Sequence, residues 1–478
     1  MRNLLILFLL CSTIATSFAQ SKEELINRSV FNRIEYFVNT NMGDSIYTLA
    51  SEKFKTAVSK AQFEFALNNL YKLGQIKNTE TLDFKGRTGI YLLTLEDDAY
   101  VEAHLTLDST YHFDGLLFRP TEKPLPKPDK EEVISEVTKV SPIDFFIDSV
   151  ANSYVRKQNA QSLAIGIFHQ NGYKTYFYGE TEKGNKQLPT EDTQYEIGSI
   201  TKVFTAVLLA DLVNKGTIQL DDSIAKYLPD SVAANPDIQK ITFKSLANHT
   251  SGLPRLPGNL EQVKDFNPND PYATYNTAAL YAFLKDYKAT REVGQEYEYS
   301  NLGFGLLGEI LASISKKTYA QLLQQTLLTP LQMVNTTDKP DPKKQQMVKV
   351  YNKNGEEVAV WNFQSMLAAG GIKSTVKDLM LFAVEQFKMP ENELQNAMAL
   401  TRLFTFATPD FTDIGLAWHM NMMDGLIYFH HTGGTGGSSS FIGLSPDTKT
   451  ALVVLSNAET SVNNISVTIL EKLLSNVE

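Results

Sequence analysis

The chain has 478 residues, of which 43% are hydrophobic and 21% charged, and its formal net charge is -10. This length exceeds one ordinary domain, and the composition supports packed cores rather than global disorder. The acidic balance, with no long basic run, excludes the basic face that a nucleic-acid partner requires.

The N-terminus is typical of an export signal. Arg2 provides a positive charge, Leu4 to Leu10 form an apolar core, and small residues precede Ala19. This pattern predicts a signal peptide over residues 1–19, cleaved after Ala19, and a periplasmic or secreted protein. The apolar run is shorter than the roughly 20 residues of a membrane span, and no later stretch is long and apolar enough, so no transmembrane anchor is expected.

Cys11 is the only cysteine of the chain, and it lies inside this segment. It follows Leu10, where a lipidation site would need a small residue, so lipidation is not expected. The mature chain would then contain no cysteine, which excludes disulfides, thiol nucleophiles and cysteine zinc sites. No H-E-x-x-H motif or carboxylate cluster predicts a metal, and no cofactor is expected.

Residues 20–118 predict a small α+β domain. Apolar residues recur at spacings of three and four from about Glu24 to Gly74, which is typical of helices. Alternating stretches then predict the strands of a meander, at 88–96, 99–108 and 111–120. Helices followed by an antiparallel meander imply an α+β unit. His104 and His112 lie on these strands without a matching carboxylate motif and are interpreted as ordinary sheet residues.

Residues 119–139 predict a linker, because four prolines stand among charged residues in its first part. The remainder, 140–478, predicts a larger α+β domain. Asn171-Gly172 joins two alternating runs as a hairpin. A helical middle spans about Ser199 to Met389, after which three strands and a last helix close the chain. Strands at both ends of a helical insert imply one antiparallel sheet flanked by helices, with a helical subdomain beside it.

The stretch 198–202, GSITK, places a serine and a lysine at the start of an apolar run that ends at Gly216. The spacing of its apolar residues predicts a helix with one buried face. Three residues turn an α-helix by about 300°, so Ser199 and Lys202 are expected on the same side, one turn apart.

Such a pair suits nucleophilic catalysis. A serine at a helix start has a free backbone N–H that can face an oxyanion. Burial lowers the pKa of a lysine, so Lys202 on a largely apolar helix is expected to be neutral and to accept the proton of Ser199. The ordinary alternative is a capping serine followed by a surface lysine, since Ser is a favoured N-cap and S-x-x-K alone is a weak pattern.

Two further motifs accompany GSITK. Tyr299-Ser300-Asn301 precedes another apolar helical run, and His431-Thr432-Gly433 ends a strand before several more glycines. S-x-x-K, Y-x-N and (K/H)-T-G in this order resemble the serine β-lactamase and penicillin-binding-protein superfamily. The tyrosine version is similar to the class C branch, with its esterases, D-aminopeptidases and DD-carboxypeptidases. Two stretches agree with that resemblance, Leu246–Pro254 (LANHTSGLP) and Ala368–Phe382 (AAGGIKSTVKDLMLF).

The resemblance covers about 140–478 and implies the β-lactamase/transpeptidase fold. The small domain resembles a nuclear-transport-factor-like domain of unknown function with a cone-like shape. That second resemblance rests on the order of helices and meander and on the closing sequence DGLLFRP.

The resemblance also implies roles for the three motifs. Ser199 would attack a carbonyl and become acylated, and water would then hydrolyse the acyl-enzyme. Lys202 and Tyr299, the latter as a phenolate, would share the proton transfers. Asn301 would orient the substrate amide or the lysine. The backbone N–H groups of Ser199 and Gly434 would form the oxyanion hole.

His431, Thr432 and Gly433 would line the substrate site. Lactamases of this superfamily usually carry lysine where this chain has His431. A neutral imidazole offers one donor and no full charge near pH 7, so the motif favours esters, amides or peptides over β-lactams.

The predicted function is therefore an exported serine hydrolase acting on an ester, a D-amino-acid substrate or a cell-wall peptide, with possible cell-wall association. A β-lactamase or penicillin-binding DD-carboxypeptidase is the alternative among enzymes. A binding or sensing module, acylated without turnover or unreactive, is the alternative outside enzymes.

Three more histidines are candidates for catalytic groups. His249 would need a Ser-His-Asp arrangement, but the sequence has no G-x-S-x-G motif, so it is interpreted as a structural loop residue. His430 neighbours His431 on a strand and would point to the opposite face. His419 is interpreted as a sheet or rim residue.

Overall fold

The computed structural model describes residues 22–96, 99–121, 133–157, 160–408, 412–423 and 425–475. The chain divides into two compact units, residues 1–124 and 125–478, and each is described by itself. The expected signal peptide and cleavage site, Cys11, and residues 122–132 of the predicted linker lie outside the described residues. In the part of the chain that is described, no helix has the length and apolar character needed to cross a bilayer.

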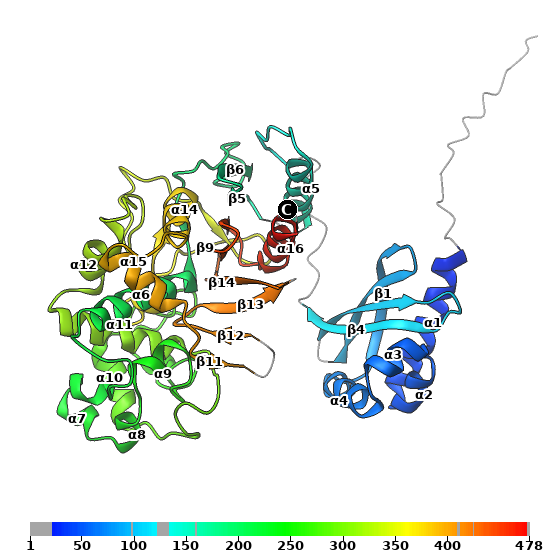
Figure 1. The fold of residues 1–478 in the computed structure, drawn as a ribbon, viewed down its shortest axis with the longest axis horizontal. Coiled ribbons are helices and arrows are strands. Elements are labelled where there is room, and N and C mark those ends of the chain that lie inside the picture. The colour runs from blue at the N-terminus through cyan, green and yellow to red at the C-terminus, as the bar shows by residue number, and fades with distance from the viewer. Residues whose placement is uncertain are drawn as a thin grey trace, which may run out of the picture. The chain divides into compact units, whose positions relative to one another are not determined.

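In its described residues, the small unit contains four helices and a four-stranded antiparallel meander in the order β1-β2-β3-β4 (Figure 1). Its elements are α1 (Lys22–Asn39), α2 (Gly43–Thr48), α3 (Glu52–Ala57), α4 (Lys60–Tyr71), β1 (Ile76–Lys85), β2 (Thr88–Leu95), β3 (Tyr100–Leu107) and β4 (Phe113–Thr121). Alternate residues of β2 and β3, such as Leu93 and Ala103, are buried under helical residues such as Phe31 and Ile34. This packing is the α+β arrangement that the sequence predicts.

Two features of this sheet differ from the prediction. Strand β1 was not expected, because only Ile76 of its residues is buried and its polar sequence lacks apolar alternation. Such a polar, charged strand is typical of a sheet edge. Strand β4 continues to Thr121, two residues beyond Arg119, where the linker was expected to begin. Pro120 is tolerated there because β4 is the other edge, where a missing N–H breaks no ladder.

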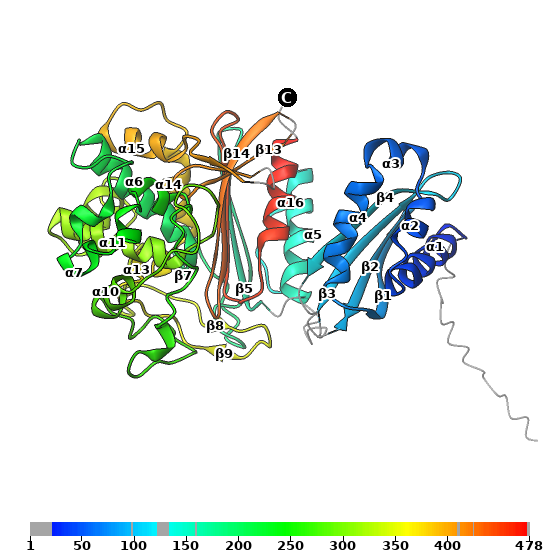
Figure 2. The ribbon, with the colours of Figure 1, turned by 90° about the horizontal axis from the view of Figure 1, so that it is seen from below.

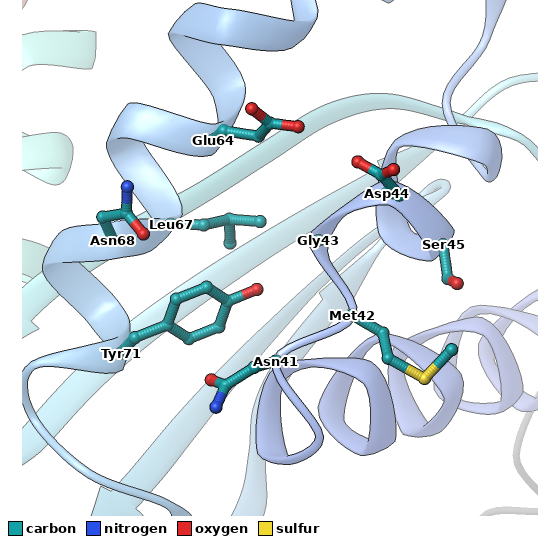
Figure 3. Close-up of a pocket in the computed structure, with 9 residues that line it drawn as sticks. All are labelled: Asn41, Met42, Gly43, Asp44, Ser45, Glu64, Leu67, Asn68 and Tyr71. Atoms are coloured by element: carbon teal, nitrogen blue, oxygen red, sulfur yellow. The ribbon is translucent and has the colours of Figure 1, made fainter.

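A pocket of about 400 Å³ lies between α2 and α4 of the small unit (Figure 3). Asp44 and Glu64 line it together with Tyr71, but Lys60 lies 2.8 Å from Asp44 and balances that charge. His104 bonds to Glu102 on its own strand at 2.6 Å. None of the site residues expected from the sequence belongs to this unit.

The large unit is built on an eight-stranded antiparallel sheet in the order β11-β12-β13-β14-β15-β16-β5-β6. Figure 2 shows this sheet edge-on, between the helical subdomain on one side and α5 (Pro142–Lys157) and α16 (Asn463–Leu474) on the other. Its strands are β5 (Ser162–His169), β6 (Gly172–Gly179), β11 (Phe406–Ala407), β12 (Asp413–Ile414), β13 (His419–Met423), β14 (Leu426–Gly434), β15 (Ser439–Ser445) and β16 (Thr450–Ser456). The two ends of the unit meet in the sheet, where Leu455 of β16 lies opposite Ala164 of β5. The expected fold class, one antiparallel sheet flanked by helices, is confirmed.

Alternation along the central strands gives the sheet two apolar faces. Leu163 and Ile165 pack with α5 and α16 on one face. Ala164 belongs to the opposite core, where α14 (Val376–Glu385) covers β5 and β16. A Cβ at Gly166 would lie 2.6 Å from Val376 of α14, so this close approach requires glycine.

The segment between β6 and β11 supplies the helical subdomain and, among its described residues, two short strand pairs, β7-β10 and β8-β9. Its elements are β7 (Tyr195–Glu196), η2 (Gly198–Ile200), α6 (Thr201–Asn214), η3 (Ile224–Tyr227), α7 (Asp230–Ala233), α8 (Pro236–Gln239), α9 (Phe243–Ala247), η4 (Leu260–Gln262), α10 (Thr277–Lys285), α11 (Asn301–Ser315), α12 (Tyr319–Leu323), η5 (Gln324–Leu328), β8 (Val350–Tyr351), β9 (Glu357–Val358), α13 (Leu367–Gly370), β10 (Lys373–Ser374) and α15 (Glu393–Thr401).

The helix α6 is buried on all sides, so the expected single buried face is wrong. Every residue from Thr201 to Leu212 is buried. Helices α11, α13 and α15 all contact α6, and a helix surrounded by other helices has no solvent face. Lys202, on the first turn of α6, is therefore enclosed by protein.

Candidate active site

Ser199 lies in a single turn of 3-10 helix, η2, directly before α6. Its side chain is half-buried and thus retains access to solvent. The preceding residue, Gly198, has φ +47°, a region that disfavours side chains. A Cβ at Gly198 would lie 2.6 Å from the amide nitrogen of Gly434. Glycine therefore allows the turn that carries the serine to lie against the end of β14.

Lys202 is completely buried, and its Nζ contacts three oxygens. It lies 3.0 Å from Oγ of Ser199, 2.8 Å from Oδ1 of Asn301 and 2.6 Å from the carbonyl oxygen of Ala369. Burial lowers the pKa of Lys202 well below its usual value, and the charge of Arg255 lowers it further. The amine is therefore poised to be neutral.

The three contacts of a neutral Lys202 determine where its lone pair points. A neutral amine has two N–H bonds and one lone pair. The Asn301 and Ala369 oxygens are carbonyl oxygens, which can only accept hydrogen bonds, so they take the two N–H bonds. The lone pair is left facing the hydroxyl of Ser199, which can donate its proton.

Tyr299 and Asn301 come from the start of α11, about a hundred residues after Ser199. Ser300 caps this helix by accepting a bond from the Gly303 amide at 2.9 Å, which orients its two neighbours. Nζ of Lys202 lies 4.8 Å from the ring centroid of Tyr299. Asn301 accepts from Lys202 and also donates to the Tyr272 hydroxyl at 3.3 Å.

The phenolate expected at Tyr299 is not supported by its surroundings. Burial raises the pKa of Tyr299, and a hydrogen bond with Ser199 and the charge of Arg255 only partly offset this effect. The phenol is therefore protonated, and it can act as a hydrogen-bond donor or acid beside Ser199.

His249 has a supporting role in this arrangement. Its Nδ1 accepts a hydrogen bond from the Ser300 amide at 3.0 Å, and its ring lies 4.4 Å from that of Tyr299. Burial lowers the pKa of His249 well below its usual value, so the ring is neutral. The histidine thus fixes the backbone between Tyr299 and Asn301 and makes no contact with Ser199.

The third motif ends β14, which pairs with β15. A Cβ at Gly433 would lie 2.1 Å from the carbonyl oxygen of Ile197, so only glycine lets β14 pass the chain that leads into Ser199. Thr432 and Gly433 are half-buried, and Gly434 is exposed. The amide of Gly434 therefore lies beside the turn that carries the serine.

The sequence predicts that a neutral His431 offers one N–H donor to the substrate, but in the structure that N–H is already used. Its Nδ1 donates to the Thr432 carbonyl oxygen at 2.7 Å. Burial lowers the pKa of His431 well below its usual value, so the ring is neutral and its other nitrogen, Nε2, carries only a lone pair. A carboxylate cannot be held by this side chain, because no positive charge and no free N–H remain.

The remaining histidines lie beside this strand. Nε2 of His430 bonds to Oδ1 of Asn421 at 2.7 Å. His419 bonds through Nε2 to the hydroxyl of Tyr297 at 3.0 Å, and its ring lies 5.3 Å from that of His431.

Glu196, a buried carboxylate that was not predicted from the sequence, connects several segments of the site. Glu196 accepts hydrogen bonds from the Trp361 amide at 2.8 Å and from the Thr435 hydroxyl at 2.7 Å. It thereby connects the chain before Ser199 to the glycine-rich turn after β14. Lys373, opposite Glu196 in the β7-β10 pair, is buried nearby. No local pattern marks Glu196, because its partners are far away in sequence.

Aromatic side chains lie beside Asn301 and this turn. Tyr272 stacks on Phe363 with ring centroids 5.0 Å apart and meets Trp361 edge-on at 5.6 Å. A Cβ at Gly436 would lie 2.9 Å from Nε1 of Trp361. This aromatic cluster gives the site an apolar wall suited to the hydrocarbon part of a substrate.

The sequence profile of the family described as Beta-lactamase matches residues 147–473, well over half of the chain. The chain belongs to the beta-lactamase family. The chain is therefore a serine hydrolase. The alternative of an unreactive binding module has no support from this membership.

The matches to two curated relatives cover most of the length of each relative. The chain is 28% identical over 316 residues to the D-alanyl-D-alanine-carboxypeptidase/endopeptidase AmpH of Escherichia coli (strain K12), covering 63% of this chain and 80% of the relative. It is 27% identical over 371 residues to a beta-lactamase of Psychrobacter immobilis, covering 69% and 88%.

A solved class C beta-lactamase has the same fold, with a TM-score of 0.63 and 26% identity over 70% of this chain and 96% of the other. The structure titled beta-lactamase/D-alanine carboxypeptidase from Pseudomonas syringae aligns with a TM-score of 0.63 at 24% identity, over 71% of this chain and 100% of the other. The expected superfamily and its class C fold are confirmed.

The partly buried His430 predicts a pH-dependent stability. Burial lowers the pKa of His430 to about 3. Unfolded histidine protonates near pH 6.5, so between pH 6.5 and 3 the unfolded state binds the additional proton and stability falls as pH decreases. The variant His430→Gln does not titrate. We expect it to gain stability relative to wild type by about 1.4 kcal/mol per pH unit as pH falls from 6.5 to 4.5.

Urea unfolding at several pH values measures this difference. The control is the same comparison between pH 7 and 8, where both proteins should show no relative change. A relative stability that is independent of pH below 6.5 would contradict a neutral His430 in the folded protein.

Proposed function

We propose that this serine hydrolase acts through an acyl-enzyme on Ser199 and hydrolyses an ester or amide, in particular a D-amino-acid or cell-wall peptide. The observation that carries the proposal is the buried Nζ of Lys202, which lies 3.0 Å from Oγ of Ser199. A buried, neutral amine beside a half-exposed hydroxyl is the arrangement that activates a serine without a histidine.

Acylation begins when Lys202 removes the proton of Ser199 and Oγ attacks the substrate carbonyl. The resulting oxyanion accepts bonds from the backbone N–H groups of Ser199 and Gly434. The protonated phenol of Tyr299 then gives its proton to the leaving group as the scissile bond breaks, and the Lys202 ammonium restores that proton. Deacylation repeats these steps in reverse, with water in place of the leaving group.

Other groups of the site bind and orient the substrate. Asn301 holds the Lys202 amine with its oxygen, and the N–H that it does not donate to Tyr272 is available to a substrate carbonyl. Thr432 and Gly433 present the end of β14 to the substrate, and the aromatic cluster accepts its apolar portion.

The choice among substrates rests on two observations. The relatives carry names of D-alanyl-D-alanine carboxypeptidase and of beta-lactamase. The neutral His431 removes the cation of the third motif, which favours a peptide or ester over a β-lactam. A β-lactamase or penicillin-binding carboxypeptidase is the second candidate, supported by the relatives' names.

We further propose that the chain is exported by a signal peptide over residues 1–19 and carries a small α+β domain of the nuclear-transport-factor-like type over 20–118. The helix-then-meander order of the small unit supports the second assignment. Possible cell-wall association follows from the proposed substrate.

A labelling experiment tests the nucleophile. A fluorophosphonate should add one label to the wild-type protein, whereas Ser199→Ala should take up none and lose at least about 10³-fold in hydrolysis of a p-nitrophenyl ester. Intact-mass spectrometry over time measures the label. Hydrolysis of p-nitrophenyl esters, D- and L-amino-acid anilides and nitrocefin by both proteins ranks the substrates.

Equal melting temperatures of Ser199→Ala and wild type provide the control for folding. Labelling of the Ser199→Ala protein at the wild-type rate would exclude Ser199 as nucleophile. With penicillin, a persistent adduct indicates slow deacylation, and a transient adduct indicates turnover.

A further inference from the structure

Arg255 follows the LANHTSGLP stretch and lies at the catalytic site. Its backbone carbonyl accepts hydrogen bonds from the amides of Asn301 at 3.0 Å and Leu302 at 3.2 Å, so the start of α11 holds the residue in place. Its guanidinium carbon lies 5.1 Å from the ring centroid of Tyr299. The side chain is exposed, in contrast to the buried Lys202 that contacts the same ring.

The charge of Arg255 is not neutralised by any carboxylate in the described ranges. The nearby Glu298 is paired with Arg291 instead. The positive charge acts on the catalytic groups, since it lowers the pKa of Lys202 and also opposes the raised pKa of Tyr299. An arginine fixed by its backbone, exposed and without a counter-ion has its N–H donors available to a ligand.

The third motif has no positive charge and no free N–H with which to bind an anionic group of the substrate. His431 is neutral, and its only N–H is donated to the Thr432 carbonyl. Of the two cationic residues that touch Tyr299, Lys202 is buried and poised to be neutral, and Arg255 is exposed. An anionic group on a substrate bound beside Ser199 therefore has Arg255 as its natural partner, and guanidinium binds carboxylate with two parallel hydrogen bonds.

We propose that Arg255 binds a carboxylate of the substrate at the catalytic site and supplies the positive charge that the third motif lacks. This inference rests on the proposed function, because it specifies the substrate of the same site. The carboxylate belongs either to the leaving group, as at the C-terminus of a peptide, or to the acyl portion. Both sources present the same chemistry to the guanidinium.

Two substrate pairs distinguish the sources. The first pair is N-acetyl-L-lysyl-D-alanyl-D-alanine and its C-terminal amide, in which the charge is on the leaving group. The second pair is mono-p-nitrophenyl glutarate and its methyl ester, in which the charge is on the acyl portion. We expect Arg255→Gln to lower kcat/KM by about 10- to 100-fold for the charged member of one pair, and by less than about threefold for its neutral member.

Two further variants serve as controls. Arg255→Lys keeps the charge but loses the planar fork, so its loss should be smaller than that of Arg255→Gln. Lys226→Gln removes an exposed cation that pairs with Asp222 elsewhere in the same unit, and it should leave both substrate pairs unchanged. The preference for the charged member should also weaken at high salt in wild type.

Equal losses for both members of each pair, or no loss for any, would overturn the role of Arg255. Failure of the proposed function is a separate result: no fluorophosphonate label on Ser199 and no hydrolysis of any substrate. In that case, calorimetry tests whether Arg255 binds the carboxylate. It compares binding of the peptide acid and of its amide to Ser199→Ala and to the double variant Ser199→Ala with Arg255→Gln. Acid-selective binding that disappears with the second substitution supports the assignment, and its absence overturns it.

Discussion

Lys202→Met should lower kcat/KM for an activated ester by at least about 10³-fold while Ser199 keeps its position. Methionine fills a similar volume but has no lone pair that can take a proton. The loss should appear in kcat rather than in KM, because the amine acts on the reacting hydroxyl and does not touch the rest of the substrate. Stopped-flow measurement of acylation by a p-nitrophenyl ester tests the expectation.

The pH dependence of the wild-type enzyme provides an independent signature of Lys202. Its pKa in the folded protein lies well below the usual 10.5. Protonation removes the lone pair, so kcat/KM should fall as pH decreases through that lowered pKa and level off above it. A neutral ester avoids titration of the substrate. Lys202→Met should lack this acid limb, and retention of the limb in the variant would assign it to another group.

Lys202→Arg is the matched control, because arginine stays charged throughout this range. It should also be inactive, which separates the need for a neutral amine from the need for a long side chain. Full activity in Lys202→Arg would contradict Lys202 as the base.

Gly433→Ala should disrupt the site by a steric route and produce the second large effect. The added Cβ would lie 2.1 Å from the Ile197 carbonyl oxygen and 2.2 Å from Oγ of Ser440. The first contact is with backbone, so β14 or the chain leading to Ser199 must move. We expect a loss of about 1–3 kcal/mol in unfolding free energy, typical of overpacking, and at least about 10²-fold in kcat/KM.

Gly434→Ala is the control for this substitution. At that position the nearest atom to a Cβ is the Ser438 carbonyl oxygen, at 3.8 Å, which is ordinary contact. The control should therefore keep wild-type stability and most of the activity, since it retains the backbone N–H proposed for the oxyanion hole. Urea unfolding and ester hydrolysis measure both variants, and equal behaviour of the two would contradict the close passage of β14 beside Ile197.

Local patterns predicted the fold wherever a strand or helix had one clear apolar side. The hairpin around Asn171-Gly172 and the last three strands are examples, and their pairing into one sheet followed from their positions at both ends of the chain. Strand β1 was missed because its polar residues show no alternation, and α6 was expected to have a solvent face. In both elements, burial is set by neighbours that no local pattern encodes.

The active-site candidates illustrate the same division. The motif order alone predicted that Ser199, Lys202, Tyr299 and Asn301 belong together, although about a hundred residues separate the pairs. Glu196 and Arg255 carry no motif, so they were visible only once distant segments lay against each other.

By itself, then, the sequence determined the superfamily, the antiparallel sheet with its helical insert, and the residue types available for catalysis. Only the tertiary structure decided their chemical state: the neutral amine of Lys202, the protonated phenol of Tyr299, and the N–H of His431 donated to the Thr432 carbonyl oxygen. It also decided that an exposed arginine stands beside Tyr299. The physical reason is that a pKa and a hydrogen-bonding role depend on burial and on nearby partners, and here those partners come from distant parts of the chain.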